Sequence, residues 1–135
     1  MFSSVHLHMI NFEKFEIANG LKVLVHRDAS TPMAVVNVLY DVGARDEDPA
    51  KTGFAHLFEH LMFGGSVNIP VYDEPLQLAG GDNNAFTTND LTNYYCQLPA
   101  ENIETAFWLE SDRMLSLAFS EKSLEVQRKV VCEEF

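Results

Sequence analysis

Residues 53–63 read GFAHLFEHLMF, and the rest of the sequence is best interpreted outward from this stretch. Its apolar residues recur on nearly every side of a helix, which predicts a largely buried helix. His56 and His60 are four residues apart and therefore share one helical face, with Glu59 directly before the second histidine. Two imidazoles on one face can bind one Zn²⁺, and a neighbouring carboxylate can act as general base toward a zinc-activated water.

The alternative is an ordinary helix with two hydrogen-bonded histidines and a solvated glutamate. A chain of this composition contains about 0.02 strings of the form H-x-x-E-H by chance. Polar side chains in a buried helix also need partners, and a shared metal ion is the simplest one. We therefore interpret the pattern as a hydrolytic zinc site.

Size and charge restrict the class of protein. The chain has 135 residues, of which 47% are hydrophobic, so it can bury the core of one domain. Twenty acidic against nine basic side chains give a net charge of −11, which repels phosphate backbones. Nucleic acid is therefore not an expected partner. No stretch approaches the roughly 20 apolar residues of a membrane span.

Cysteine usage and the N-terminus bear on the compartment. Cys96 and Cys132 have no C-x-x-C spacing, so we expect buried or half-buried thiols in the cytoplasm or another reducing compartment. Residues 1–10 lack the basic and apolar regions of a secretory signal. Residues 1–11 are predicted to be a disordered leader, with Met9 as a possible start.

The alternation of strand and helix signals predicts an α+β fold, an antiparallel-rich sheet with helices packed on one face. Strands are expected at residues 12–17, 21–26, 34–42, 84–88 and 92–98. Helices are expected from an N-cap at Thr52 to residue 63, at 70–79, at 101–119, and from an N-cap at Ser120 to the end. The apolar run at 34–42 suits a central strand covered on both faces.

Further motifs follow one another along nearly the whole chain. They are GLKVLV at 20–25, YDVGARDE at 40–47, the stretch at 53–63, GDNNAFT at 81–87, YY at 94–95 and RKVVCEE at 128–134. In this order they resemble the pitrilysin/insulinase family of inverzincin zinc peptidases, most closely its processing-peptidase branch. The resemblance implies the same layered fold and a zinc-dependent endopeptidase in which Glu59 is the general base.

A catalytic zinc commonly has three protein ligands, so one is still missing. The resemblance implies a glutamate on a later helix, and Glu134 lies at about the family's spacing from His60. Glu133 is the alternative candidate for the third ligand. Glu133 has Lys129 at i−4, typical of a solvent face, whereas Glu134 has valines at i−4 and i−3, which favours the core side.

The resemblance also implies roles at two further places. Asn84, Ala85 and Phe86 correspond to an edge strand on which relatives bind an extended peptide, although an ordinary hairpin strand fits them too. Phe58 and Phe86 could line an apolar subsite or pack in the core. Gln127 stands where many relatives carry a glutamate, which predicts altered tuning of the metal rather than its loss.

Finally, the resemblance implies a second homologous half or subunit that completes a chamber around the peptide substrate. Because the sequence stops in mid-helix, residues 12–135 are expected to be the N-terminal part of a larger metallopeptidase domain. The negative charge would favour basic peptides, or would merely keep the protein soluble. The alternative function is a non-catalytic, scaffold-like subunit of the same fold, although such chains normally lose H-x-x-E-H.

Overall fold

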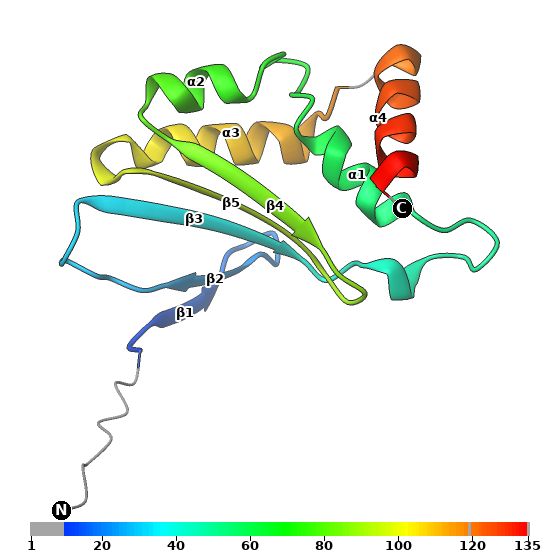
Figure 1. Cartoon of the computed structure of the whole chain (residues 1–135). Helices are drawn as coiled ribbons and strands as arrows, with labels where there is room; N and C mark the ends of the chain where they lie inside the picture. The colour runs from blue at the N-terminus through cyan, green and yellow to red at the C-terminus, as the bar shows by residue number, and fades with distance from the viewer. Residues whose placement is uncertain (1–9, 119, 135) are drawn as a thin grey trace, which may run out of the picture. The chain divides into compact units, whose positions relative to one another are not determined.

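A computed structural model describes residues 10–118 and 120–134 and divides the chain into two compact units, residues 1–31 and 32–135 (Figure 1). Residues 1–9 of the predicted leader lie outside the described residues.

The first unit is a β-hairpin. Strands β1 (Glu13–Glu16) and β2 (Lys22–Val25) pair antiparallel as a two-stranded sheet. The turn between them has Gly20 at a φ of 87°, a conformation that glycine adopts at little cost, and the Gly20 amide donates to the Ile17 carbonyl at 2.9 Å. The two strands expected at residues 12–17 and 21–26 are therefore confirmed, and they pair as a hairpin.

The second unit contains a three-stranded antiparallel sheet in the order β3-β5-β4. Its strands are β3 (Met33–Tyr40), β4 (Asp82–Thr87) and β5 (Thr92–Pro99). The prediction of a central strand at 34–42 is wrong, because β3 is an edge strand of this sheet with Val35 63% and Leu39 57% exposed. Hydrophobic content indicates a strand, but it does not reveal which strands pair beside it.

Helices cover one face of this sheet. They are α1 (Phe54–Met62), α2 (Asp73–Leu78), α3 (Ile103–Leu115) and α4 (Glu121–Glu134), with short 3₁₀ turns η1 (Ala44–Asp46) and η2 (Ala100–Asn102). Helices α1, α2 and α3 lie over the sheet, and α4 contacts α1 (Figure 1). The predicted α+β architecture with helices on one face is confirmed.

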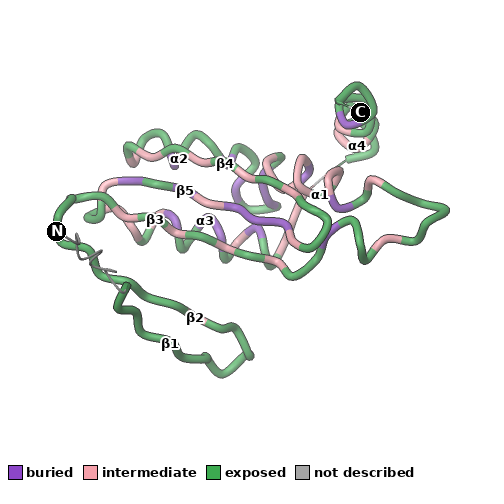
Figure 2. Tube along the Cα trace, turned by 60° about the horizontal axis from the view of Figure 1, so that its bottom comes forward, coloured by how far each residue is buried: buried purple, intermediate pink, exposed green. Residues whose placement is uncertain are grey.

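The core lies between β5 and these helices, and Figure 2 shows buried segments of β5 facing buried segments of the helices. Alternate residues of β5, Tyr94, Cys96 and Leu98, share the buried face. The core side chains are those of Ile69, Tyr72, Leu76, Cys96, Leu98, Ala106 and Leu109.

Two helices are shorter than predicted. Helix α2 begins at Asp73 rather than at residue 70, and α3 ends at Leu115 rather than at residue 119. After α3 the chain pairs with an earlier loop instead, since the Val67 amide donates to the Ser116 carbonyl at 2.9 Å. A long-range backbone contact therefore replaces the last predicted helical turn. The predicted N-cap of α4 is present, because the Ser123 amide donates to Ser120 Oγ at 3.1 Å.

A buried ion pair joins the core elements. Arg113 and Glu110, both on α3, are 3% and 4% exposed, and Arg113 Nη2 lies 2.6 Å from Glu110 Oε1. The guanidinium stacks 4.6 Å from the Tyr72 ring centroid and 4.5 Å from that of Tyr94. Arg113 Nη1 also donates to the Met62 carbonyl at 3.5 Å, at the end of α1. One side chain thereby connects α3 with β5 and the C-terminus of α1.

Both cysteines are free thiols. Cys96 is buried as predicted, and burial raises the pKa of its thiol to about 11. Cys132 is exposed, so the prediction of a buried or half-buried thiol is wrong there, because it lies on the outward side of α4.

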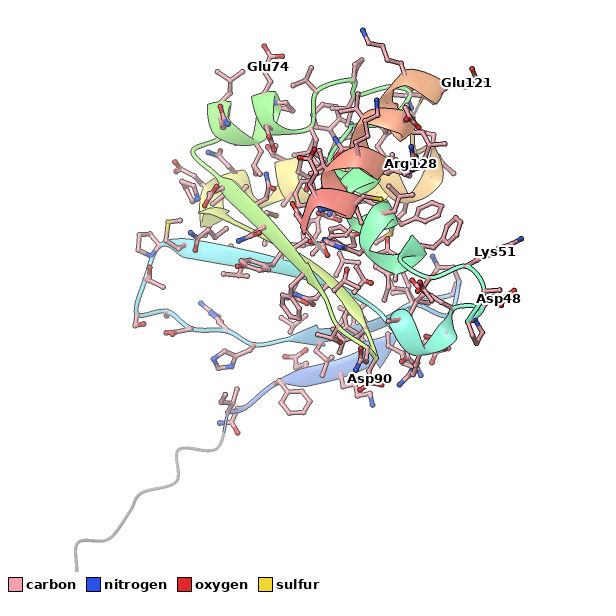
Figure 3. The ribbon with its side chains drawn as sticks, turned by 45° about the vertical axis from the view of Figure 1, so that its right-hand side comes forward. Asp48, Lys51, Glu74, Asp90, Glu121 and Arg128 are labelled. Carbon is pink, nitrogen blue, oxygen red and sulfur yellow. The ribbon has the colours of Figure 1, made fainter. Side chains whose placement is uncertain are left out.

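Acidic side chains are distributed over the surface of the second unit, and Figure 3 shows Asp48, Glu74, Asp90 and Glu121 pointing away from the ribbon. None of the helices in the described ranges has the length and apolar character needed to cross a bilayer.

Candidate metal centre

Helix α1 carries the two histidines, and its first turn is fixed by a distant carboxylate. Its N-cap is Gly53, at a φ of 91°, rather than the predicted Thr52. The cap comes from Glu47, whose two oxygens accept hydrogen bonds from the amides of Gly53 and Ala55, each at 2.7 Å. A carboxylate there satisfies amides that lack helical partners and interacts favourably with the helix dipole.

This helix is less buried than predicted. Ala55 and Leu61 are buried, but Phe54 is 50% and Phe58 47% exposed. The apolar residues therefore surround the helix without all being covered, because only one side of α1 packs against the sheet.

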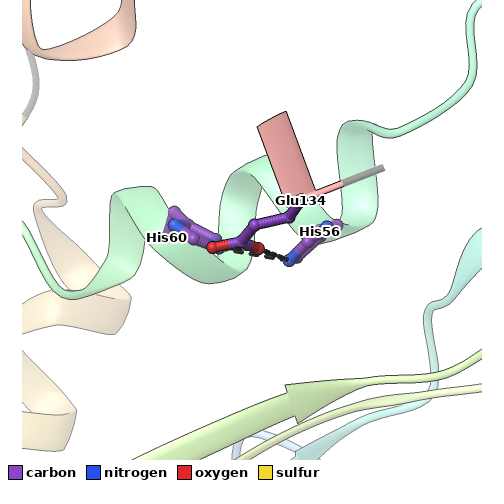
Figure 4. A group of neighbouring side chains, drawn as sticks. All are labelled: His56, His60 and Glu134. Atoms are coloured by element: carbon purple, nitrogen blue, oxygen red, sulfur yellow. Dashed lines mark hydrogen bonds and ion pairs between the residues drawn. The ribbon is translucent and has the colours of Figure 1, made fainter. Parts of the chain in front are cut away.

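Three potential ligand atoms converge between α1 and α4 (Figure 4). His56 Nε2 lies 3.1 Å from His60 Nε2, and Glu134 Oε2 lies 3.2 Å from the first and 3.5 Å from the second. Glu134 reaches this point from the last turn of α4. Glu133 does not belong to the group. Lys129, at i−4 of Glu133, forms an ion pair with Glu125, whose Oε1 lies 3.6 Å from its Nζ.

The geometry of the group fits a zinc ion. Ligand atoms about 2.0–2.1 Å from a tetrahedral metal are separated from one another by about 3.3–3.4 Å, close to the three distances observed here. Two imidazole nitrogens and a carboxylate oxygen are also electron-pair donors, so their close approach requires a cation or a proton among them. Two histidines and one glutamate form an ordinary donor set for a catalytic zinc.

Gln127 lies behind one of the histidines. Its Oε1 is 3.2 Å from His60 Nδ1. With the amide oxygen as acceptor, Nδ1 carries the proton and Nε2 presents its lone pair to the other two ligand atoms. An outer partner of this kind sets the tautomer and the orientation of a ligating ring.

Glu59 lies on the same helix, α1, and contacts the end of β4. The Thr87 hydroxyl donates a hydrogen bond to Glu59 Oε2. Both side chains are half-buried. The predicted general base therefore lies beside the sheet, on the same helix as the two histidines.

The three residues of the predicted substrate strand differ in orientation. Because Thr87 faces α1, alternation places Ala85 on that side and turns Asn84 and Phe86 to the opposite face. Phe86 is 46% exposed. Among the described strands, β4 pairs only with β5 and leaves one edge open. The Ala85 amide donates to Asn84 Oδ1 at 2.8 Å rather than to β5, so its backbone faces this edge.

Sequence reasoning missed two residues near the site. Glu47 belongs to a charged loop, and no local pattern shows that it caps a helix six residues later. Thr87 could have been found, because the antiparallel register that pairs it with Thr92 and Ala85 with Tyr94 puts it on the helix-covered face.

The H-x-x-E-H motif on α1 is the motif of the inverzincin class of zinc peptidases, and here a glutamate from a second helix joins its two histidines. The sequence matches the family model described as Insulinase (Peptidase family M16) over residues 22–135. The chain therefore belongs to this family, as the motif order indicated.

Individual relatives agree with this assignment. The zinc protease PqqE of Helicobacter pylori is 35% identical over 125 residues, which cover 90% of this chain and 28% of the relative. A probable mitochondrial-processing peptidase subunit beta of Arabidopsis thaliana is 28% identical over 134 residues, covering 96% and 25%. The crystal structure of pitrilysin superposes with a TM-score of 0.81 at 25% identity, covering 92% of this chain and 14% of that one. The chain thus spans less than a third of each protein.

Proposed function

We propose that this chain carries the zinc-binding and general-base residues of a metalloendopeptidase that hydrolyses peptide bonds. The observation that supports this most directly is the convergence of His56, His60 and Glu134, whose ligand atoms all lie within 4.8 Å of one another. Family membership and relatives named as zinc proteases support the same chemistry.

In this proposal His56, His60 and Glu134 hold one Zn²⁺. When bound, zinc lowers the pKa of a water molecule and polarises a carbonyl oxygen. Glu59 accepts a proton from the attacking water and delivers it to the leaving amine. Gln127 keeps the His60 ring in the orientation that ligation requires.

The proposed substrate is an extended peptide that adds to the open edge of β4 by main-chain hydrogen bonds. Ala85 contributes backbone groups to this pairing, while Asn84 and Phe86 contact the peptide from the other face of the strand. Asn84 must release the Ala85 amide when the peptide binds. We further propose that a second homologous half or subunit closes the site, because an open strand edge alone covers only one side of a peptide.

The test measures zinc content and peptide cleavage together, on the protein that carries this sequence. Glu134→Gln should lower zinc affinity strongly, and Glu133→Gln, one residue away, serves as the matched control and should not. Glu59→Gln should retain zinc while cleavage falls by at least about 10²–10⁴-fold, the contribution of a general base.

Each outcome separates the parts of this proposal. Loss of zinc in Glu59→Gln would make Glu59 a ligand instead of a base. Full zinc loading without cleavage of any peptide, also after addition of the homologous half, would favour the non-catalytic, scaffold-like subunit.

A further inference from the structure

The Glu59 carboxylate has one hydrogen-bond partner within residues 10–118 and 120–134, the hydroxyl of Thr87. This bond engages Oε2 and leaves Oε1 available. A general base needs one oxygen aimed at the proton that it accepts, and a carboxylate on a flexible side chain is not oriented by its own helix. The hydroxyl supplies that orientation from a neighbouring strand.

Thr87 is itself held firmly. It is the last residue of β4, opposite Thr92 in the ladder, and the turn that follows is closed by the Thr88 amide donating to the Leu91 carbonyl at 2.8 Å. A loop after β3 pins the same turn, since the Ala44 amide donates to the Thr88 carbonyl at 3.2 Å. A Cβ on Gly43 would lie 2.5 Å from the Asn89 carbonyl oxygen, so this close approach requires glycine.

The backbone of Thr87 faces the open edge of β4. Thr88 and Leu91 form a hydrogen-bonded pair, and such pairs alternate along an antiparallel ladder. The β4 residues that lie between successive hydrogen-bonded positions, including Ala85 and Thr87, therefore direct their amide and carbonyl groups away from β5. A strand added at this edge would pair beside the residue that holds Glu59.

We propose that Thr87 is a positioning residue, which orients the Glu59 carboxylate and aligns it with a peptide bound along β4. This inference rests on the proposed function. The Thr87 hydroxyl bonds the proposed base and is not one of the three ligand groups. Loss of this hydroxyl should therefore affect the rate of proton transfer and leave zinc binding and main-chain peptide binding nearly unchanged.

The experiment compares Thr87→Val, which keeps the shape and removes the hydroxyl, with Thr87→Ser, which keeps the hydroxyl. The matched control is Thr92→Val, which removes the hydroxyl on the same rung that donates to the Val42 carbonyl at 3.0 Å. Thr87→Val should lower kcat by about 10–100-fold, the range expected when a catalytic group is displaced by about 1 Å. KM and zinc affinity should stay within about twofold, and Thr87→Ser should restore kcat.

A second readout does not depend on turnover. The ¹³C chemical shift of the Glu59 carboxyl carbon should change in Thr87→Val and remain unchanged in Thr92→Val. If the wild-type protein binds zinc but cleaves nothing even with the homologous half added, the proposed function fails. An unchanged chemical shift in Thr87→Val would overturn the positioning contact independently. Unchanged kcat in Thr87→Val, with an active wild type, would refute the inference alone. Thr87→Ala replaces the valine variant if that one does not fold.

Discussion

Gln127 is the hydrogen-bond partner behind one of the proposed metal ligands. Its carbonyl oxygen accepts from His60 Nδ1 at 3.2 Å and carries no charge. A carboxylate in this place would raise the basicity of the ring and so its affinity for a metal, whereas an aliphatic side chain would leave the ring unoriented.

We expect zinc affinity to decrease from glutamate to glutamine to leucine at position 127. Gln127→Leu should weaken binding by about 10–100-fold, the usual cost of losing an outer partner, and Gln127→Glu should tighten it. Competition with a chromogenic chelator measures both. Gln77→Glu on α2 adds the same charge away from the site and should change nothing. Equal affinity in all variants would show that His60 does not depend on this contact.

At the scale of single elements, α1 depends on a cap that comes from outside its own sequence. Glu47 satisfies two amides of the first turn, close to the first histidine. Glu47→Ala should lower the free energy of unfolding by about 1–2 kcal/mol, as for a lost N-cap, and weaken zinc binding because the turn before His56 frays. Urea unfolding and chelator competition check this.

Asp48→Ala is the control for Glu47→Ala. Asp48 is the next residue, and its carboxylate accepts a hydrogen bond from the Ala50 amide of its own loop, at 2.9 Å. Asp48→Ala should lower the free energy of unfolding by at most about 0.5 kcal/mol, the range of ordinary surface substitutions. A similar loss in both variants would mean that the loop as a whole, rather than the cap, stabilises α1.

Helix α3 offers a comparison between a buried and an exposed pair of the same kind. Arg113 and Glu110 are buried, whereas Arg128 and Glu125 form the same i, i+3 pair on the exposed surface of α4. Arg113→Met should cost about 3–5 kcal/mol, because it leaves the Glu110 charge buried without a countercharge, although the Tyr72 hydroxyl still donates to Glu110 Oε1 at 2.6 Å. Arg128→Met should not measurably change stability, since solvent screens that pair.

The double variant Glu110→Leu with Arg113→Met tests the reason for this loss. If the cost of Arg113→Met comes from the uncompensated carboxylate, removing that carboxylate should recover most of the stability. A double variant as unstable as the single one would instead attribute the loss to the stacking of the guanidinium on Tyr72 and Tyr94. Thermal and urea unfolding distinguish the two.

At the scale of the whole molecule, the metal centre joins two helices from distant parts of the sequence. A ligand that binds only the folded chain stabilises it, by about 2.7 kcal/mol when the free ligand is at 100 times Kd. Zinc at that concentration should raise the Tm accordingly, and a chelator should reverse the change. His56→Ala should show neither effect. An equal rise in His56→Ala would indicate zinc bound elsewhere.

The sequence by itself determined the features that depend on near neighbours. The i, i+4 spacing of His56 and His60 and the strand signals at residues 12–17 and 21–26 are local, and the order of the motifs identified the family. The identity of the strands was also predictable. Their order was not, because β3 carries a more continuous apolar run than β5 although β5 is central.

Only the tertiary structure decided which distant groups meet. It brings the Glu134 carboxylate to the two imidazoles and the Gln127 amide to His60. It also brings the Thr87 hydroxyl to Glu59 and the Glu47 carboxylate to the first turn of α1. Each of these contacts joins residues on different elements, so its geometry follows from how the helices pack on the sheet and on one another. Local propensity and periodicity describe a segment and its faces, and they carry no information about which face of another segment will lie opposite.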